Sequence, residues 1–496
     1  RPADVPAWDD MPEEFKPALR RQMEVYAGFL EFTDYHVGRL FEVIENLGLA
    51  DDTLVYYIIG DNGASAEGSF NGCFNEMSYF NGLQALETAE YLTERIDKLG
   101  GPESYNHFAV GWAHALNTPY QWTKQVASHF GGTRNGTIVH WPKGIQAKGE
   151  LRTHFAHVID VAPTILEAAG IPEPVSVDGI QQDAIDGVSM LKTFNDAKAP
   201  EFHETQYFEV MGNRAIYHKG WTAVTKHYTP WIPNVKPALD DDVWELYDTT
   251  KDWSQARDLS KEMPDKLREL QRLWIIEATR NKVLPIDDRI FEKMNPDTAG
   301  RPTLVKGKTQ VLAGGMSHLG ENCVLNIKNK SHSVTAAIVV PQGGAEGVII
   351  AQGADIGGWS LYAKGGKLKY CYNWGGFKHF IIEGGSVMSP GEHQVRMEFA
   401  YAGGGLGKGG KVTLYVDGQK DGEGEVGATL AMVFSADDGL DVGKDGGSAV
   451  SPEYAPGNNS FNGKVKGVQL AIDEAAEDLD HLLDPADVIR MAMARQ

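Results

Sequence analysis

The run of residues 53–63 constrains the fold of this chain more than any other stretch. Residues 53–59 read Thr-Leu-Val-Tyr-Tyr-Ile-Ile, a continuous apolar, β-branched and aromatic run. Such a run predicts a strand buried on both faces, as in a parallel sheet with helices on each side. Gly60 ends the run, and Asp61, Asn62 and Gly63 follow at once. In open α/β sheets, ligands bind beyond the carboxyl ends of the strands, so we expect the chemistry at this point of the chain.

Asp61 and Asn62 have side chains suited to a hard metal ion. Both present oxygen atoms, which are the ligands that Ca²⁺ and Mg²⁺ take in proteins. The alternative is that Asp61, Asn62 and Gly63 form only a turn, because these residue types dominate turns for local conformational reasons. The tripeptide alone leaves both interpretations open.

The composition limits the partners of the chain. Its 496 residues predict two to four domains with ample core. The formal net charge of -22 argues against nucleic acid and anionic membrane as partners, and an anionic substrate would need a local cationic pocket. No stretch approaches the roughly 20 apolar residues of a membrane span. Three cysteines are too few for a disulfide framework, and they leave the cellular compartment open.

Hydrophobic periodicity divides the first 295 residues into helices and strands. Residues 18–47 carry a helical stripe that includes Leu30, Leu40 and Ile44. Residues 64–117 form a long connection rich in Gly, Asn, Ser and aromatic residues, which is typical of a lid or a binding loop. Further elements are expected as a short helix at 85–99, a strand at 137–142, a helix at 160–170, two or three antiparallel strands within 202–230, a strand at 243–248 and an amphipathic helix at 264–281.

The pattern changes near residues 295–302, where we place a linker. Beyond it, short alternating runs separated by Gly, Asp and Asn predict an all-β sandwich. The stretch 403–409 is expected to be a glycine-rich hairpin rather than a phosphate-binding loop, because Lys408 is followed by glycine. Strands of the sandwich are expected at 333–340, 347–352, 358–363, 367–373, 392–401, 411–416 and 464–472. The predicted domains are 1–200, 201–295 and 303–472, with an acidic and weakly helical tail at 473–496.

Four motifs in residues 18–285 resemble a known family. They are Asp34-Tyr-His-Val-Gly-Arg-Leu, Gly60-Asp61-Asn62-Gly63, the loop from Lys124 to Gly131-Gly132-Thr-Arg134, and His157-Val-Ile-Asp160-Val-Ala-Pro163. In this order they resemble the C-terminal half of the catalytic domain of a sulfatase, of the bacterial arylsulfatase-like type within the alkaline phosphatase superfamily. The resemblance implies an incomplete α/β domain with a parallel-rich sheet and a small antiparallel subdomain. The all-β region that follows resembles a laminin-G or concanavalin-like jelly roll.

The resemblance implies roles for three of these residues. Asp61 and Asn62 match the positions that coordinate one Ca²⁺, with Mg²⁺ less expected, and that ion also binds a sulfate oxygen of the substrate. Lys124 matches a lysine that contacts the sulfate group. Sulfate-ester cleavage builds negative charge on the nonbridging and leaving oxygens, which a cation and an ammonium would offset. A solvated loop lysine is the alternative for Lys124.

Two more side chains of the Lys124 loop are candidates for the site. His129 could act as a general acid on the leaving group, although a structural role is the usual one for a loop histidine. Arg134 could bind an anion through two hydrogen bonds, or could support the loop through carboxylates.

The chain departs from the family pattern at the nucleophile. Family catalysis depends on a Cys-x-Pro-x-Arg motif whose cysteine becomes formylglycine, and Cys73, Cys323 and Cys371 all lack that context. The chain also opens at Arg1 without an initiator methionine. We therefore expect a missing N-terminal segment of the same protein as its partner, carrying the formylglycine, and an inactive chain without it. The compartment is left open between bacterial cytoplasm and periplasm.

Other functions stay open at this point. One is a phosphodiesterase or phosphonate hydrolase of the same superfamily, which the upstream nucleophile and the metal count would distinguish from a sulfatase. Another, from a different class, is a noncatalytic protein that binds a glycan through the sandwich. The sandwich could also shape the rim of the site or hold a homo-oligomer together, since fold does not supply function.

Overall fold

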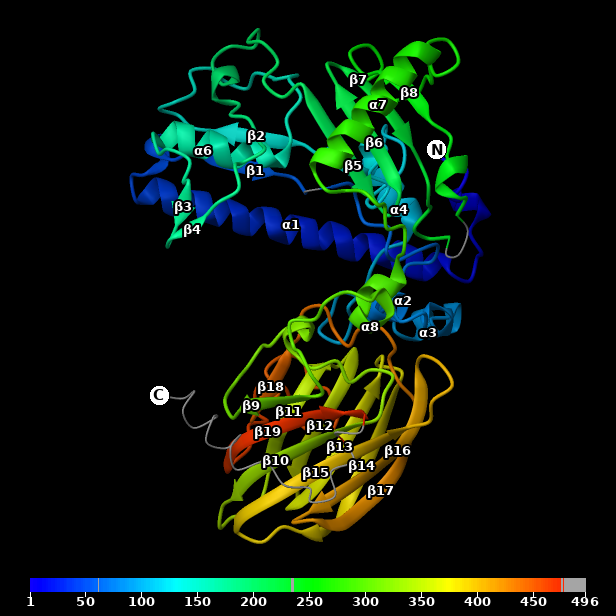
Figure 1. Ribbon diagram of the computed structural model, residues 1–496, viewed down its shortest axis with the longest axis vertical. Coiled ribbons are helices and arrows are strands. Elements are labelled where there is room, and N and C mark those ends of the chain that lie inside the picture. The colour runs from blue at the N-terminus through cyan, green and yellow to red at the C-terminus, as the bar shows by residue number, and fades with distance from the viewer. Residues whose placement is uncertain (61, 233–235, 474–475, 477–496) are drawn as a thin grey trace. The chain divides into compact units, whose positions relative to one another are not determined.

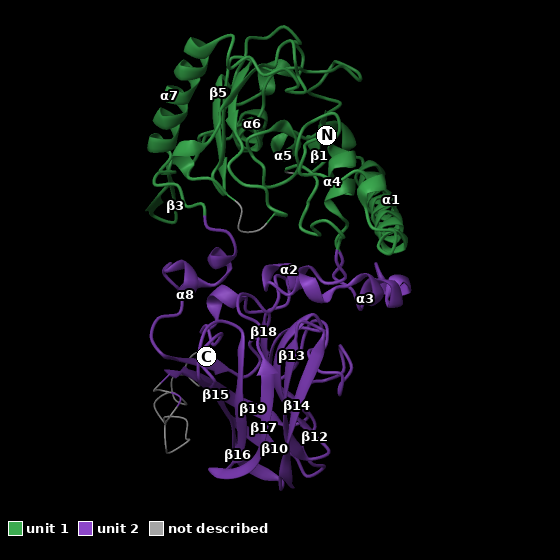
Figure 2. Ribbon diagram, turned by 90° about the vertical axis from the view of Figure 1, so that its right-hand side faces the viewer, with its two compact units in different colours: residues 1–72, 107–288 green, residues 73–106, 289–496 purple. Residues whose placement is uncertain are grey.

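The computed structural model describes residues 1–60, 62–232, 236–473 and 476. The predicted tail at 473–496 therefore lies almost wholly outside the described residues. The chain forms two compact units, one of residues 1–72 and 107–288 and the other of residues 73–106 and 289–496 (Figure 2). This division differs from the predicted domains, because the expected boundary at residue 200 lies inside the first unit. It differs again because residues 73–106 join the sandwich rather than the region that surrounds them in sequence.

Unit 1 begins with a single long helix, α1 (Lys16–Asn46), drawn in dark blue in Figure 1. The helix predicted at 18–47 is confirmed, and its buried residues all lie at its N-terminal end, at Lys16, Ala18, Leu19 and Gln22. The predicted stripe is not a buried face, since Leu30 is 49% exposed and Leu40 is 60% exposed. Periodicity shows where apolar residues line up on a helix but not what covers them.

A two-stranded ribbon carries the apolar run at residues 53–59. Strand β1 (Val55–Ile58) pairs with β2 (Thr137–His140), with Val55 opposite His140 and Ile58 opposite Thr137. The pairing is antiparallel, so the parallel pairing expected for residues 53–59 is wrong. Both strands are half-buried or exposed rather than buried on two faces. An apolar run specifies a strand, whereas the direction of its partner depends on the path of the chain between them.

The second half of unit 1 is built on a four-stranded antiparallel sheet with a helix packed against it. Its strands run in the order β5-β6-β7-β8, and Figure 1 shows α7 lying across them. Ile216 and Leu246 of the sheet share one hydrophobic core with Leu270 and Trp274 of the helix. The predicted antiparallel subdomain is confirmed. The bounds are β5 (Thr205–Val210), β6 (Asn213–His218), β7 (Trp221–Thr225), β8 (Glu245–Asp248) and α7 (Pro264–Arg280).

Short elements complete unit 1. The helix expected at 160–170 is α6 (Val161–Ala169), which has Pro163 in its first turn and is followed by Gly170 in the left-handed conformation, at φ +67°. The other short elements are α4 (Val110–Asn117), α5 (Phe130–Thr133), β3 (Ser176–Val177) and β4 (Ile180–Gln181). None of the helices in the described part of the chain is long and apolar enough to cross a membrane.

Unit 2 is the predicted sandwich of two antiparallel sheets. One sheet has the order β17-β16-β15-β10-β19-β9 and the other β14-β13-β12-β11-β18. In β10, alternate residues from Val334 to Val340 point into the core, where they meet Trp359 and Leu361 of the facing sheet. The strands are β9 (Thr309–Ala313), β10 (His332–Val340), β11 (Gly347–Ala354), β12 (Gly357–Lys364), β13 (Lys367–Trp374), β14 (Lys378–Val387), β15 (Gly391–Tyr401), β16 (Lys408–Val416), β17 (Gln419–Ala428), β18 (Leu440–Val442) and β19 (Lys464–Ile472).

All seven predicted strands of the sandwich are confirmed, and four more are present. The hairpin predicted at 403–409 joins β15 to β16, with Tyr401 opposite Gly410. Strands β14 and β17 were not predicted because their glycines and charges weaken the alternation on which a sequence reading depends. Three short helices complete the unit, α2 (Glu76–Phe80), α3 (Ala89–Glu94) and α8 (Pro296–Ala299), and α3 is the confirmed part of the helix expected at 85–99.

Candidate functional site

The loop that follows β1 packs directly against the glycines of the Lys124 loop. Asp61 lies outside the described residues, so its predicted role stays a prediction. Gly63 is required by close packing, because a Cβ atom there would lie 1.5 Å from the carbonyl oxygen of Gly131. The Asn62 loop and the Gly131-Gly132 segment, which motif reasoning placed in one site, therefore lie in contact.

Asn117 ties the two loops together. Its Oδ1 accepts a hydrogen bond from the Ala64 backbone N–H at 3.0 Å, and its Nδ2 donates to the carbonyl oxygens of Gly131 at 2.8 Å and Trp122 at 3.2 Å. The backbone N–H of Lys124 also donates to the Ala64 carbonyl at 3.1 Å. Sequence reasoning missed Asn117, because an asparagine at the end of a short helix has no motif around it.

The ammonium group of Lys124 is held by a carboxylate. Its Nζ lies 3.0 and 3.1 Å from the two carboxylate oxygens of Glu67, which also accepts from Gln125 at 3.1 Å and from Ser65. Glu67 is only 8% exposed, whereas the Lys124 side chain is one third exposed. An ammonium has three N–H donors, so contact with two carboxylate oxygens leaves at least one donor free. Lys124 is thus oriented and still able to donate to an anion.

His107 lies within electrostatic reach of this ion pair. Its Nδ1 is 3.1 Å from the carbonyl oxygen of Phe108, which can only accept, so the proton is assigned to Nδ1. Burial lowers the pKa of His107, and the positive charge of Lys124 lowers it further. The hydrogen bond to Phe108 and the negative charge of Glu67 raise it, but the net pKa is lowered. The neutral ring then presents Nε2 as an acceptor. His107 and Glu67 were both missed by the sequence reading, because neither stands in a recognisable motif.

Asn62 opens onto a cavity of about 300 Å³. One wall comes from β5, and the other lining residues come from the Asn62 loop, the Lys124 loop and His157. The lining residues are Asn62, Ala127, Gly132, Thr133, His157, Gln206, Tyr207, Phe208, Glu209 and Val210. Among the described residues, the Asn62 carboxamide has no hydrogen-bond partner. Its oxygen is therefore not engaged by any residue that the structure describes.

Among the described residues, Asn62 could supply one ligand of a calcium site. The free carboxamide oxygen of Asn62 is a hard neutral ligand of the kind that Ca²⁺ takes, and a Ca²⁺ ion needs six to eight oxygens. Within the residues that the structure describes, no three His, Cys, Asp or Glu side chains gather to hold a metal ion. The remaining ligands would have to come from Asp61, from water and substrate, or from another polypeptide segment.

A buried hydrogen-bonded pair, Asp160 and His203, supports the His157 wall of the cavity. Asp160, which is fully buried, accepts hydrogen bonds from His203 Nδ1 at 2.8 Å and from the backbone N–H groups of His157 at 2.7 Å and Val188 at 2.8 Å. Burial lowers the pKa of His203, but the hydrogen bond and the charge of Asp160 outweigh it, and the net pKa is raised. His157 itself caps the turn before α6, because its Nδ1 accepts a hydrogen bond from the Ile159 backbone N–H at 3.4 Å.

His129 faces inward. Its side chain is 2% exposed, with Nδ1 2.9 Å from Ser128 Oγ and Nε2 3.1 Å from a carboxylate oxygen of Glu245. Both ring nitrogens are engaged, so these contacts fit the structural alternative better than the general-acid role.

Arg134 supports the loop from outside. Its guanidinium lies over the rings of Tyr120, at 5.5 Å, and Phe130, at 5.2 Å, and donates to the Trp253 carbonyl oxygen at 3.4 Å. The expected carboxylate partner is thus replaced by aromatic rings and a carbonyl group.

Comparisons with known proteins match the region that holds this site. The family model described as Sulfatase matches residues 4–171, and the model described as N-sulphoglucosamine sulphohydrolase, C-terminal, matches residues 123–273. A solved structure from Bacteroides thetaiotaomicron, described in connection with the metabolism of multiple glycosaminoglycans, has a TM-score of 0.34 and 20% identity, over 50% of this chain and 43% of that one.

Two curated relatives are also sulfatases by name. An uncharacterized sulfatase of Schizosaccharomyces pombe is 30% identical over 295 residues, which are 58% of this chain and 49% of that protein. An arylsulfatase of Klebsiella aerogenes is 27% identical over 164 residues, which are 33% of each chain. The chain thus spans half or less of the length of the curated relatives it matches. The matches include Asp61, Asn62 and Lys124 in one continuous region, so residues 4–273 are identified as sulfatase-family sequence, and a β-sandwich follows them.

Proposed function

We propose that this chain supplies the metal-binding and sulfate-binding half of a sulfuric ester hydrolase of the arylsulfatase type. One observation carries the proposal. Within the region that matches the sulfatase models, the backbone of Lys124 is bonded to Ala64, two residues beyond Asn62, and a cavity opens at Asn62. A free carboxamide oxygen and an oriented ammonium are thus supplied by two loops that lie in contact.

We assign each residue of the site a role according to its charge. Asp61 and Asn62 would hold one Ca²⁺, which supplies positive charge for a nonbridging sulfate oxygen. Lys124 donates its remaining N–H to a second sulfate oxygen, and Glu67 fixes the direction of that N–H. An oriented donor needs no reorganisation as charge develops on the sulfate group, which is the condition for effective electrostatic stabilisation. Arg134 keeps the loop in place through Tyr120 and Phe130.

The nucleophile is proposed to come from a further segment that carries formylglycine. No cysteine of the printed sequence stands in a Cys-x-Pro-x-Arg context. In unit 1, a set of large apolar side chains has no cover among the described residues. On α1, Phe29 is 65% exposed, Phe32 61% and Val43 54%, and Ile138 of β2 is 54% exposed. Exposed apolar surface of this kind marks an interaction site, and a segment that covers it could bring the nucleophile to the cavity.

The experiment examines the protein from its native source. Denaturing mass spectrometry with peptide mapping would look for a companion segment with formylglycine, and the native sample would be assayed on an aryl sulfate, an aryl phosphodiester and an aryl phosphonate. We expect hydrolysis of the sulfate ester that a calcium chelator abolishes and added Ca²⁺ restores. Preference for the phosphodiester or phosphonate would overturn the sulfatase assignment, and a native sample without any hydrolysis would leave a noncatalytic binding protein.

A further inference from the structure

Residues 73–106 leave unit 1 and fold with the sandwich (Figure 2). The chain departs after Gly72 and returns at His107. On both sides of this excursion stand residues of the candidate site, with Glu67 shortly before it and His107 at its end. The sequence reading expected a lid or a binding loop here. The contacts of the segment indicate a different role.

Inside unit 2, two asparagines join the excursion to the sandwich. Asn75, which is 3% exposed, donates from Nδ2 to the carbonyl oxygens of Ile356 at 3.0 Å and Gly375 at 2.9 Å. Asn81 donates to the Val433 carbonyl and accepts from the Met432 N–H, both at 2.9 Å. In a sheet, a neighbouring strand would form hydrogen bonds with such backbone groups. Here the two asparagine side chains form them instead.

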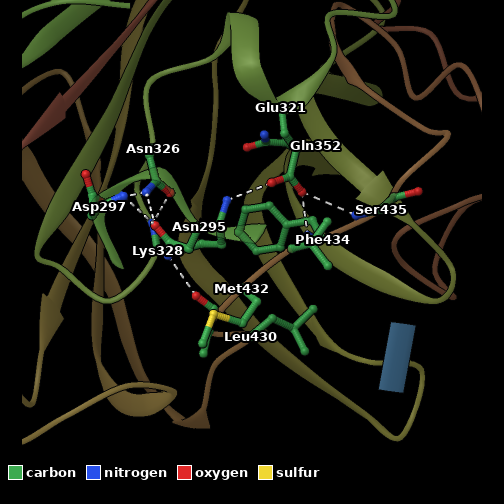
Figure 3. Close-up of polar contacts among 12 residues, drawn as sticks. Asn295, Asp297, Glu321, Asn326, Lys328, Gln352, Leu430, Met432, Phe434 and Ser435 are labelled. Carbon is green, nitrogen blue, oxygen red and sulfur yellow. Dashed lines mark hydrogen bonds and ion pairs between the residues drawn. The ribbon is translucent and has the colours of Figure 1, made fainter. Parts of the chain in front are cut away.

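The stretch at residues 430–435 depends on such side-chain bonds throughout. It lies between β17 and β18 and belongs to no strand. Figure 3 shows Glu321 reaching the backbone N–H groups of Phe434 and Ser435. Asn295 donates to the carbonyl oxygen of Ala431 at 2.9 Å. Glu321 is itself paired with Lys328 at 2.7 Å, and both side chains are largely buried.

Inside unit 1, the two ends of the excursion are joined to each other. The Val110 N–H donates to the Ser69 carbonyl at 2.7 Å. The side chain of Gln22, which is 1% exposed, bridges the ends, since its Nε2 donates to the Asn71 carbonyl at 2.9 Å and its Oε1 accepts from the Ala109 N–H at 3.2 Å. These hydrogen bonds join residues 67–72 to residues 107–110, so we expect the two segments to become ordered together.

We propose that the sandwich positions the Lys124–Glu67–His107 group by anchoring residues 73–106, with Asn81 as a positioning residue. The excursion is closed at its own base, because the Tyr105 N–H donates to the Phe74 carbonyl at 3.1 Å and the Glu76 N–H donates to the Tyr105 carbonyl at 2.9 Å. Its anchorage in unit 2 stabilises this closed base against the entropy that a free loop of the same length would gain by opening. The structural coupling stands on the contacts above; its effect on turnover rests on the proposed function.

The test compares hydrogen exchange of the full chain with and without Asn81→Ala. Asn458→Ala, at an exposed asparagine of unit 2, is the matched control. We expect Asn81→Ala to lower protection at least tenfold at residues 73–106 and 430–435, and also at 64–72 and 107–113, while the control changes neither. If Asn81→Ala does not fold, Glu321→Gln weakens the same 430–435 stretch from another element and should give the same pattern.

The outcomes separate this inference from the proposed function. Loss of protection confined to unit 2, with residues 64–72 and 107–113 unchanged, would overturn the positioning role. In the native protein assayed on an aryl sulfate, Asn81→Ala should lower kcat more than it raises KM, and Asn81→Asp, which keeps the acceptor oxygen, should recover part of the loss. Coupled loss of protection in a protein without sulfatase activity would support the positioning and refute the proposed function.

Discussion

Asn117→Ala should loosen both loops of the candidate site at once. The side chain makes three hydrogen bonds, with the Ala64 N–H and with the carbonyl oxygens of Gly131 and Trp122. Each net hydrogen bond contributes about 1 kcal/mol, and alanine leaves all three backbone groups without this partner. We therefore expect a loss of about 3 kcal/mol in the local stability of these loops, which corresponds to a change of roughly 100-fold in opening.

Native-state hydrogen exchange measured by mass spectrometry is the suitable assay, because a chain with two compact units has no single unfolding free energy. Peptides that contain Ala64 and Gly131 should exchange roughly 100-fold faster in Asn117→Ala. The control is Asn46→Ala, since Asn46 is the exposed last residue of α1. Exchange within threefold of the wild type at both peptides would refute the view that Asn117 joins the loops.

Three further predictions concern the site and its support. In the complete native enzyme, Lys124→Ala should lower kcat on an aryl sulfate by about 10²–10³-fold, because one preorganised donor is lost, while the circular dichroism spectrum stays unchanged. The control is Lys143→Ala, at an exposed lysine, which should have no effect. A wild-type kcat in Lys124→Ala would refute the assignment. In the same protein, we expect elemental analysis to find Ca²⁺ in the wild type and none in Asp61→Ala, and an unchanged calcium content would remove Asp61 from the proposed metal site. The raised pKa of His203 adds stability to unit 1 that is fully present below its unfolded pKa of about 6.5 and is lost as pH rises through the raised folded pKa. Exchange of the His157 and Val188 amides should accordingly speed up above pH 6.5 beyond its intrinsic pH dependence, and His203→Gln should remove that excess; an equal pH dependence in both proteins would contradict it.

Local elements could be predicted well where one physical pattern dominates. The alternation of β10 predicts its buried face, because successive side chains point to opposite sides of a strand. The proline and glycine of α6 mark its two ends for conformational reasons that act within a few residues. The same holds for the antiparallel strands around Asn213, where the turn residues separate two β-rich runs.

Only the site residues that stand in a recognisable motif could be predicted from the sequence. Asn62 and Lys124 were found because each stands in a recognisable sequence context, and their loops do lie in contact. Glu67, His107 and Asn117 were not found. Each acts through a partner that is distant in sequence or through a backbone carbonyl, and neither kind of contact leaves a pattern in the chain.

Local periodicity and short motifs were enough to predict the sulfatase resemblance of residues 18–285, the all-β character of the C-terminal region and most element positions. The folded structure is needed to learn that β1 pairs antiparallel, that His129 is enclosed by Ser128 and Glu245, and that residues 73–106 belong to the sandwich. All three have one cause. Pairing direction, burial and side-chain partners depend on which distant segments meet, and the free energy of those contacts is not encoded in any window of neighbouring residues.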